Sequence, residues 1–266
     1  MIPVDAHTML EIAPRFSGAN GNRQAAIVAA VGAVLRPTLE RYAIDSRLRI
    51  AHFLGQTGVE SAGFRTTEEF ADGTAYEGRK DLGNTEPGDG PRFKGRGLIQ
   101  LTGRANYRAM GKTLKLDLEN NPAQAADPAL SLVIACEYWK SRKINDAADQ
   151  DDVMRVTRLI NGGLNGLEER RNFTSRAKTA LARLEGILVT GAQPEASHAT
   201  LHRGAKGEDV AGLQRMLRGL GFALAVDGDF GAATELAVTQ FQQGQELVAD
   251  GVVGAKTWAA LEKAAG

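Results

Sequence analysis

Apolar residues recur at steps of three and four along the segment that leads to Glu60, which is the spacing of one helix face. The residues with this spacing are Leu48, Ala51, Leu54, Gly58 and Ala62, and the remaining circumference carries Ile50, Phe53 and Val59. Ser46 can cap the first turn and Gly63 can end the helix, so Glu60 falls in the last turn. The pattern predicts a helix surrounded by protein, with a carboxylate at its C-terminal end.

Similar spacing predicts helices over most of residues 1–186. We expect two helices within residues 1–45, the second at about 23–42 with a break at Arg36-Pro37, because proline has no backbone N–H. Further helices are expected at residues 129–140, 151–159 and 167–184. Between the last two, the glycine-rich residues 161–166 predict a turn that presents backbone and an amide side chain at the surface.

The helical periodicity is lost at residues 64–94, where glycine, proline and charged residues alternate. A loop of this length inside a compact domain is usually functional or disordered. Because both of its ends adjoin ordered segments, we expect a substrate-binding lobe. The following residues, 94–107, open with glycines, contain a short run of β-forming residues and lead into a helix that Thr102 can cap.

The C-terminal part of the chain has a different character. Residues 187–203 show little periodicity and are expected to form a linker of moderate flexibility. In residues 204–266 an amphipathic helix is followed by an Asp-Gly turn at 227–234, and this turn recurs 23 residues later at 250–257. Each turn leads into a helix, which predicts a small three-helix module. We expect its aromatic residues to form its core, namely Phe230, Phe241 and Trp258.

The charges of the chain balance, with 32 Lys and Arg against 32 Asp and Glu. The chain therefore lacks the overall positive field typical of nucleic-acid-binding proteins. The most apolar early segment, residues 25–35, is too short to cross a bilayer and has no basic segment before it. We expect a core helix there, no nucleic-acid partner, no membrane insertion and no signal peptide, and a monomer that folds in a cytoplasm.

Cysteine and histidine give no sign of a metal site or of nucleophilic catalysis. Cys136 is the one cysteine of the chain and lies on an apolar helical face, which predicts a buried, inert thiol. The four histidines form no HExxH pattern: His7, His52, His198 and His202. We expect no disulfide, no metal and no other cofactor.

Glu60 is an uncommon choice for its position, because the helix dipole places partial negative charge at the C-terminal end and burial disfavours an ionised carboxylate. Both effects favour the protonated carboxyl, which is the form that a general acid needs. The alternative is a solvated glutamate at a fraying helix end.

Several spaced motifs give the chain its resemblance to known families. Residues 1–186 resemble a glycoside hydrolase family 19 domain, in the branch that contains phage endolysins, through residues 58–64, Glu69, residues 95–102 and residues 161–163. Residues 204–262 are similar to a peptidoglycan-binding module, through Val210, Leu213-Gln214, the two Asp-Gly turns and Gln240-Phe241-Gln242. The resemblance implies a mainly α protein, with a lysozyme-like, bilobed helical hydrolase domain that has a minor β element, and a C-terminal three-helix module.

The resemblance also implies roles for individual residues. Family 19 enzymes invert: one carboxylic acid protonates the glycosidic oxygen and a second carboxylate, roughly 6.5–9.5 Å away, activates water. By position Glu60 is the acid, Glu69 is the base and Thr102 hydrogen-bonds the water, while the expected sugar contacts are Gln100, Asn106 and Asn161. Three alternatives stay open, with Glu68 as the base, Thr102 as a helix cap and Asn161 as a turn former.

The functional hypothesis is an endolysin that hydrolyses β-1,4 bonds of bacterial peptidoglycan as a muramidase or lysozyme does, with peptidoglycan as its partner. Such a protein is expected to stay in the host cytoplasm until a holin releases it to the periplasm and cell wall. The alternatives are a chitinase acting on β-1,4-linked N-acetylglucosamine, a lytic transglycosylase, and a non-catalytic wall-binding protein.

Overall fold

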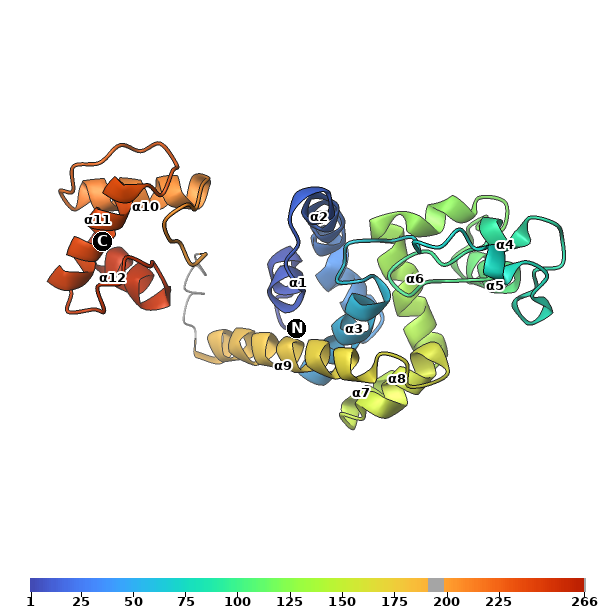
Figure 1. Cartoon of the computed structure of the whole chain (residues 1–266). Helices are drawn as coiled ribbons and strands as arrows, with labels where there is room; N and C mark the ends of the chain where they lie inside the picture. The colour runs from blue at the N-terminus through green and yellow to red at the C-terminus, as the bar shows by residue number, and fades with distance from the viewer. Residues whose placement is uncertain (191–198, 266) are drawn as a thin grey trace. The chain divides into compact units, whose positions relative to one another are not determined.

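The computed structural model describes residues 1–190 and 199–265, which belong to two compact units, Met1–Thr190 and Gly191–Gly266 (Figure 1). The predicted linker at 187–203 lies partly on residues outside this description. The fold is mostly helical, which confirms the predicted class. No helix in the described part of the chain is both long and apolar enough to span a membrane.

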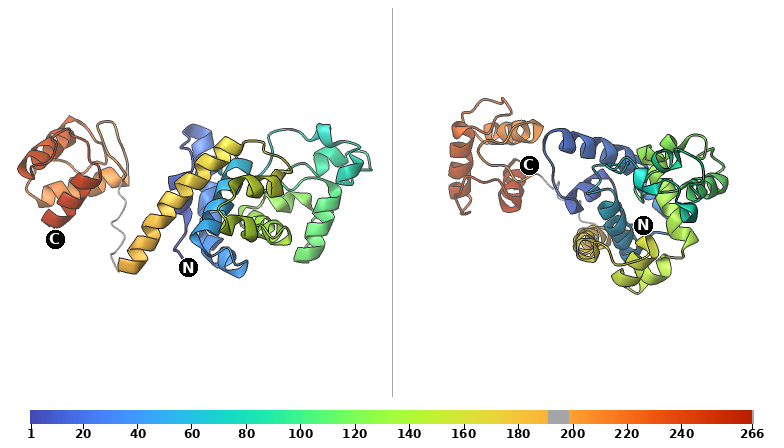
Figure 2. Two further views of the ribbon diagram at one scale, coloured as in Figure 1. Left: turned by 90° about the horizontal axis from the view of Figure 1, so that it is seen from below. Right: turned by 45° about the vertical axis from the view of Figure 1, so that its right-hand side comes forward.

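The first unit is built from helices arranged as two lobes. Its longer elements are α1 (Ala6–Ile12), α2 (Gly18–Arg41), α3 (Arg47–Glu60), α5 (Arg104–Leu114), α6 (Pro128–Ser141), α8 (Val153–Asn161) and α9 (Leu167–Thr190). Shorter ones are η1 (Thr74–Tyr76), η2 (Lys80–Leu82), α4 (Asp89–Arg92), η3 (Pro122–Ala126) and α7 (Asn145–Asp149). Figures 1 and 2 both show α4 and α5 with their loops at the far end of the unit from α1 and α2.

Helix α3 is the centre of the larger lobe and confirms the predicted helix. Ser46 caps it by accepting a hydrogen bond from the backbone N–H of Arg49 at 3.3 Å. Gly55 and Gly58 let α9 pack closely, since a Cβ at either position would lie 2.2 Å from Thr174 Oγ1 or 2.7 Å from the Phe173 ring. The helix ends at Glu60, as expected.

The predicted break in the second helix is wrong. Helix α2 runs without interruption through Pro37 and begins five residues before the expected start. Proline removes one backbone hydrogen bond, but Leu35 and Leu39 on either side of it are fully buried and α2 packs against α6. Burial of one apolar face outweighs the local penalty, and it confirms the predicted core helix at residues 25–35.

Buried polar contacts hold the long loop of the smaller lobe in place. Asp89 is 1% exposed and accepts hydrogen bonds from the backbone N–H groups of Thr85 and Glu86 as well as from the Arg104 guanidinium. The hydrogen bond from Arg104 holds the pKa of the Asp89 carboxyl below its usual range. The minor β element consists of isolated bridges that pair Arg96 with Glu68 and with Leu101.

His52 lies within α3, fully buried, with its Nε2 2.8 Å from a carboxylate oxygen of Asp151. Its Nδ1 has no hydrogen-bond partner among the described residues. Burial lowers the pKa of His52, and the hydrogen bond to Asp151 opposes this effect only in part. The neutral imidazole is therefore the form that the folded unit accommodates.

We expect the first unit to lose stability as the pH falls below the ordinary histidine pKa of about 6.5. Its unfolded state takes up the proton of His52 first, because the folded-state pKa is the lower of the two. The melting temperature, measured by calorimetry at pH 7.5 and 5.0, should drop less in a His52→Gln variant than in the parent. A His202→Gln variant in the second unit is the control, and an equal drop in the parent and His52→Gln would contradict the assignment.

The second unit contains α10 (Glu208–Gly219), α11 (Ala232–Gly244) and α12 (Ala255–Ala265) in its described part, in line with the predicted helical module. Phe230, Phe241 and Trp258 are buried in its core, as predicted. In the first unit Cys136 is also fully buried, and burial raises the pKa of its thiol far above the ordinary value, as expected for an inert cysteine.

Two glutamines give the repeated turns of the second unit the same hydrogen bonds. Gln214 Nε2 donates to Asp227 Oδ1, to the main-chain oxygen of Asp229 and to Thr234 Oγ1, at 2.8–3.1 Å. Gln242 makes the equivalent contacts in the second copy, with Asp250 Oδ1, the main-chain oxygen of Val252 and Thr257 Oγ1, at 2.9–3.1 Å. Each buried amide therefore ties one turn to the start of the helix that follows it.

Candidate active site

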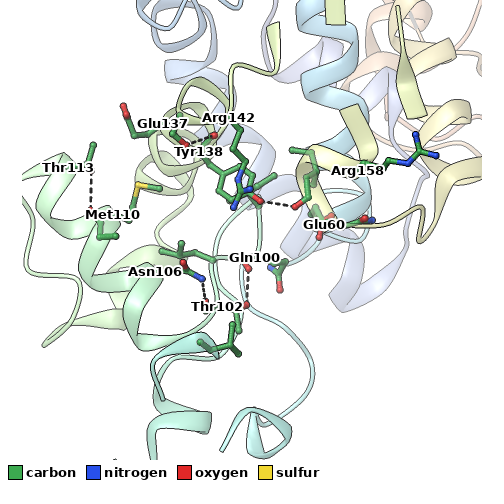
Figure 3. A pocket seen from close by; sticks show the side chains of 18 of the residues that line it. Glu60, Gln100, Thr102, Asn106, Met110, Thr113, Glu137, Tyr138, Arg142 and Arg158 are labelled. Carbon is green, nitrogen blue, oxygen red and sulfur yellow. Dashed lines mark hydrogen bonds between the residues drawn. The ribbon is translucent and has the colours of Figure 1, made fainter. Parts of the chain in front are cut away.

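A groove of about 930 Å³ opens at the C-terminal end of α3, between the two lobes of the first unit (Figure 3). Its walls come from the end of α3, from α5, from α6 and the residue after it, from α8, and from the loop before α5. Five of the six predicted site residues line it: Glu60, Gln100, Thr102, Asn106 and Asn161. The sixth, Glu69, is hydrogen-bonded to the groove-lining residue Tyr76.

Glu60 is held by a buried arginine from a distant part of the chain. The Arg170 Nη2 lies 2.6 Å from Glu60 Oε1, and the two side chains are 5% and 17% exposed. Arg170 also donates to Gln56 Oε1 at 2.7 Å and to the main-chain oxygen of Asn165 at 3.1 Å. A buried carboxylate needs such a partner, and the sequence argument for Glu60, which counted only burial and the helix end, did not anticipate it.

Glu69 lies in the smaller lobe and receives two hydrogen bonds. Its Oε1 accepts from the backbone N–H of Gly95 at 2.7 Å, and its Oε2 accepts from the Tyr76 hydroxyl at 2.9 Å. Its own backbone N–H donates to the Gly95 carbonyl at 3.0 Å. The carboxylate is therefore fixed in direction at both oxygens, as a base that must meet one water molecule requires.

Gly95 is the point at which three of the predicted residues meet. A Cβ added there would lie 2.8 Å from Gln100 Oε1, 3.2 Å from Thr102 Oγ1 and 3.4 Å from Glu69 Cδ. Any larger residue would displace one of these side chains. The absence of a side chain at this position thus keeps the amide, the hydroxyl and the carboxylate gathered around one small space.

Thr102 does not cap α5, so that alternative is wrong. The helix begins at Arg104 with Gly103 as its N-cap residue, and the backbone N–H of Arg104 donates to Asn84 Oδ1 at 2.8 Å. The Thr102 hydroxyl instead donates to the main-chain oxygen of Gln100 at 2.9 Å. Since a carbonyl can only accept, the hydroxyl proton is committed and Thr102 Oγ1 remains able to accept a hydrogen bond from a water molecule. Gln100 itself has a φ of 53°, the kind of strained backbone found at functional sites.

Glu68, the alternative base, is oriented by two cations. Its Oε1 lies 3.1 Å from Lys94 Nζ and 3.2 Å from Arg96 Nε. Glu68 pairs with Arg96 in an isolated bridge, and its carboxylate contacts these two cations. The contacts to Gly95 and Tyr76 are those of Glu69, and the base role of Glu69 stays a prediction.

The two asparagines take part in local hydrogen bonds as well as lining the groove. Asn106 Nδ2 donates to the main-chain oxygen of Thr102 at 2.7 Å. Asn161 Nδ2 donates to the main-chain oxygen of Asn165 at 3.0 Å, and its Oδ1 accepts from the backbone N–H of Gly163 at 2.8 Å. Asn161 is thus a turn former, and a sugar contact through its remaining acceptor capacity is a further prediction.

Comparison with known proteins matches the groove-bearing unit to glycoside hydrolases. Residues 27–158 match the family model described as chitinase class I. A glycosyl hydrolase family 19 domain-containing protein of Haemophilus influenzae is 34% identical over 163 residues, which cover 50% of this chain and 80% of that protein. The chain belongs to glycoside hydrolase family 19.

Other members of family 19 resemble this chain over a smaller part of their length. Chitinase 8 of Oryza sativa is 29% identical over 140 residues, and the chain spans about half of that plant protein, 52% of its length. Chitinase C from Streptomyces griseus has the same fold, with a TM-score of 0.52 at 20% identity, over 68% of this chain and 77% of that structure.

The second unit belongs to a different family from the family 19 domain. Residues 206–261 match the model of a peptidoglycan binding domain. The chain thus joins a glycoside hydrolase family 19 domain to a peptidoglycan-binding domain. Among the described residues of either domain, no three His, Cys, Asp or Glu side chains are grouped so as to hold a metal ion.

Tyr76 is a residue of the family 19 domain that the sequence argument missed, because one tyrosine in a polar loop carries no pattern. Replacing it with phenylalanine removes the hydrogen bond to Glu69 Oε2. A hydrogen bond to a charged group contributes about 1.5–3 kcal/mol, so we expect kcat to fall by about tenfold or more with little change in KM. Steady-state kinetics of Tyr76→Phe beside a Tyr42→Phe control, which changes a tyrosine outside the groove lining, would check this.

Arg170 was missed for another reason. It stands in a run of charged residues at the start of α9, Leu167-Glu168-Glu169-Arg170-Arg171, which has the composition of a solvated helix face. Only the packing of α9 along α3 turns one of these charges inward to Glu60. A buried arginine in a charged helical segment has no local signature.

Proposed function

We propose that this protein is an endolysin-type enzyme that hydrolyses β-1,4 glycosidic bonds in the glycan strands of bacterial peptidoglycan. One observation carries the proposal, namely a family 19 groove lined by Glu60 and reached by Glu69 in the same chain as a peptidoglycan-binding domain. The domain that binds the wall would keep the groove at a high local concentration of glycan. A protein of this kind would act on the wall after release from the host cytoplasm.

The proposed reaction follows the two-carboxylate scheme with inversion. Glu60 gives its proton to the glycosidic oxygen as the bond to the anomeric carbon breaks. A water molecule on the opposite face forms the new bond to that carbon and passes a proton to Glu69. Thr102 Oγ1, whose own hydrogen bond runs to the Gln100 carbonyl, accepts the second hydrogen of this water and orients it.

The surroundings of each carboxyl group support this division of roles. Tyr76 and Gly95 donate to both oxygens of Glu69 and so hold this acceptor in one orientation. Glu60 lies at the groove wall formed by the larger lobe, with Arg170 behind it. Arg170 can stabilise the carboxylate that Glu60 becomes after it has delivered its proton.

Digestion of purified peptidoglycan followed by mass spectrometry of the products tests the proposal. Products with a new reducing muramic acid would support muramidase action, and NMR of the first products should show the α-anomer that inversion requires. Anhydro products, which lack one water, would show lytic transglycosylase chemistry instead. Peptidoglycan that stays uncleaved after incubation with the parent protein would refute hydrolysis and would indicate a non-catalytic wall-binding protein.

A chitinase is the second candidate, because the matched plant relatives are named chitinases. The same groove would then take neutral N-acetylglucosamine polymers. Parallel digestion of chitin oligosaccharides and peptidoglycan decides between the two by their relative kcat/KM. The peptidoglycan-binding domain favours the wall polymer.

A further inference from the structure

The groove is lined by two arginines that the proposed reaction does not use. Its charged lining residues are Glu60, Glu137, Arg142 and Arg158. Glu60 is paired with Arg170, and Glu137 is hydrogen-bonded to Tyr42. Within the described residues no carboxylate lies within 4.0 Å of the guanidinium of Arg142 or Arg158. The wall formed by α6 and α8 therefore has unpaired cations.

Arg142 is held on this wall by an aromatic side chain. Its guanidinium carbon lies over the Tyr138 ring, 4.3 Å from the ring centroid, so the cation rests against the aromatic face. The two side chains also share a hydrogen bond, and the guanidinium has further N–H groups that can donate to a ligand. Tyr138 in turn donates from its hydroxyl to the main-chain oxygen of Ile160 at 2.7 Å, which joins α6 to α8. The position of Arg142 is therefore set by the fold.

Arg142 is also near the proposed acid. The pKa of the Tyr138 phenol is raised mainly by burial. The charge of Arg142 lowers this pKa and the charge of Glu60 raises it, so both groups lie near the same phenol. Figure 3 shows the Arg142 side chain lying beside Tyr138 on the Glu60 side of the groove, whereas the Arg158 guanidinium extends away from Tyr138. A ligand group bound by Arg142 would thus sit close to the bond that Glu60 protonates.

We propose that Arg142 selects the substrate by binding a carboxylate carried by a muramic acid residue, an inference that rests on the proposed function. A chitin strand is neutral and offers the guanidinium only neutral partners. A peptidoglycan strand carries carboxylates on the substituent of alternate sugars, either the lactyl group itself or the stem peptide attached to it. A guanidinium matches a carboxylate with two parallel hydrogen bonds.

The test compares kcat/KM on two matched pairs of substrates. The first pair is peptide-free glycan strands with the lactyl carboxylates free or converted to methylamides. The second pair is intact peptidoglycan with the stem-peptide carboxylates free or amidated. We expect the parent to prefer the charged member, and Arg142→Gln to lower this preference by about tenfold, as loss of a charge-assisted hydrogen bond implies. Loss of stacking on Tyr138 affects both members of a pair and cancels in the ratio.

Two further variants sharpen the test. Arg142→Lys keeps the charge without the planar fork and should retain part of the preference, which should weaken as salt is added. Arg155→Gln removes an equal charge from α8 at a residue outside the groove lining and should keep the parental ratio.

The outcomes separate the inference from the function on which it depends. If Arg142→Gln changes the charged-to-uncharged ratio of kcat/KM in the first pair, Arg142 binds the lactyl carboxylate. If the ratio changes only in the second pair, Arg142 binds a carboxylate of the stem peptide. An unchanged ratio in both pairs, with the parent still cleaving them, overturns the role of Arg142 alone. A parent that cleaves chitin oligosaccharides but none of these strands overturns the proposed function and the inference together.

Discussion

A Glu60→Gln variant is expected to lose about three orders of magnitude in kcat while it still binds glycan, because an amide cannot supply the proton that the leaving oxygen needs. Glutamine has the same size and its oxygen can still accept from Arg170 Nη2, so the fold and the groove should survive. Release of reducing ends from peptidoglycan measures the rate. Calorimetric titration of the variant with the same strands measures the affinity for glycan that it retains.

Glu137→Gln is the matched control for this variant, since Glu137 also lines the groove and the same carboxyl is replaced by the same amide. We expect a much smaller loss from it. Equal losses in the two variants would show that the charge of the groove, and not the proton of Glu60, determines the rate. Full activity of Glu60→Gln would leave the family 19 domain without its proposed acid.

Glu69→Gln is expected to lower kcat by about two to three orders of magnitude, because the amide accepts a proton from water far less readily than a carboxylate does. The neighbouring Glu68→Gln variant separates the two candidates for the base. Glu68 is paired with Lys94 and with the buried Arg96, so its replacement should lower stability, whereas kcat should change little. Melting temperatures and kcat of the two variants, measured side by side, give the comparison.

The reverse ranking, with Glu68→Gln nearly inactive and Glu69→Gln nearly normal, would move the base by one residue. It would also leave the hydrogen bonds from Tyr76 and Gly95 to Glu69 without a catalytic purpose.

The sequence predicted helix α3 well because its signals are local. A capping serine, apolar residues at helical spacing and a terminal glycine all lie within about 20 residues of each other. The repeated turns of the second unit were equally visible, since each copy shows its Asp-Gly pair directly in the sequence. Five predicted site residues could be named because short motifs carry them, and the packing of their separate segments brings them to one groove.

What the sequence did not predict depends on contacts between distant residues. The break expected at Pro37 is absent because the packing of α2 is stronger than the local effect of one proline. The pairing of Arg170 with Glu60 spans 110 residues, and the stacking of Arg142 on Tyr138 becomes relevant only when the groove is known. Neither contact has a spacing that a reader of the sequence could recognise.

The hydrogen bonds from Gln214 and Gln242 to the repeated turns show which position of each turn can vary without a change of backbone. In both copies the amide binds the main-chain oxygen of the residue two positions after the aspartate, which is Asp229 in one turn and Val252 in the other. The shape of the turn is therefore indifferent to the side chain at that position. A protein engineer can therefore exchange this side chain and keep the same scaffold.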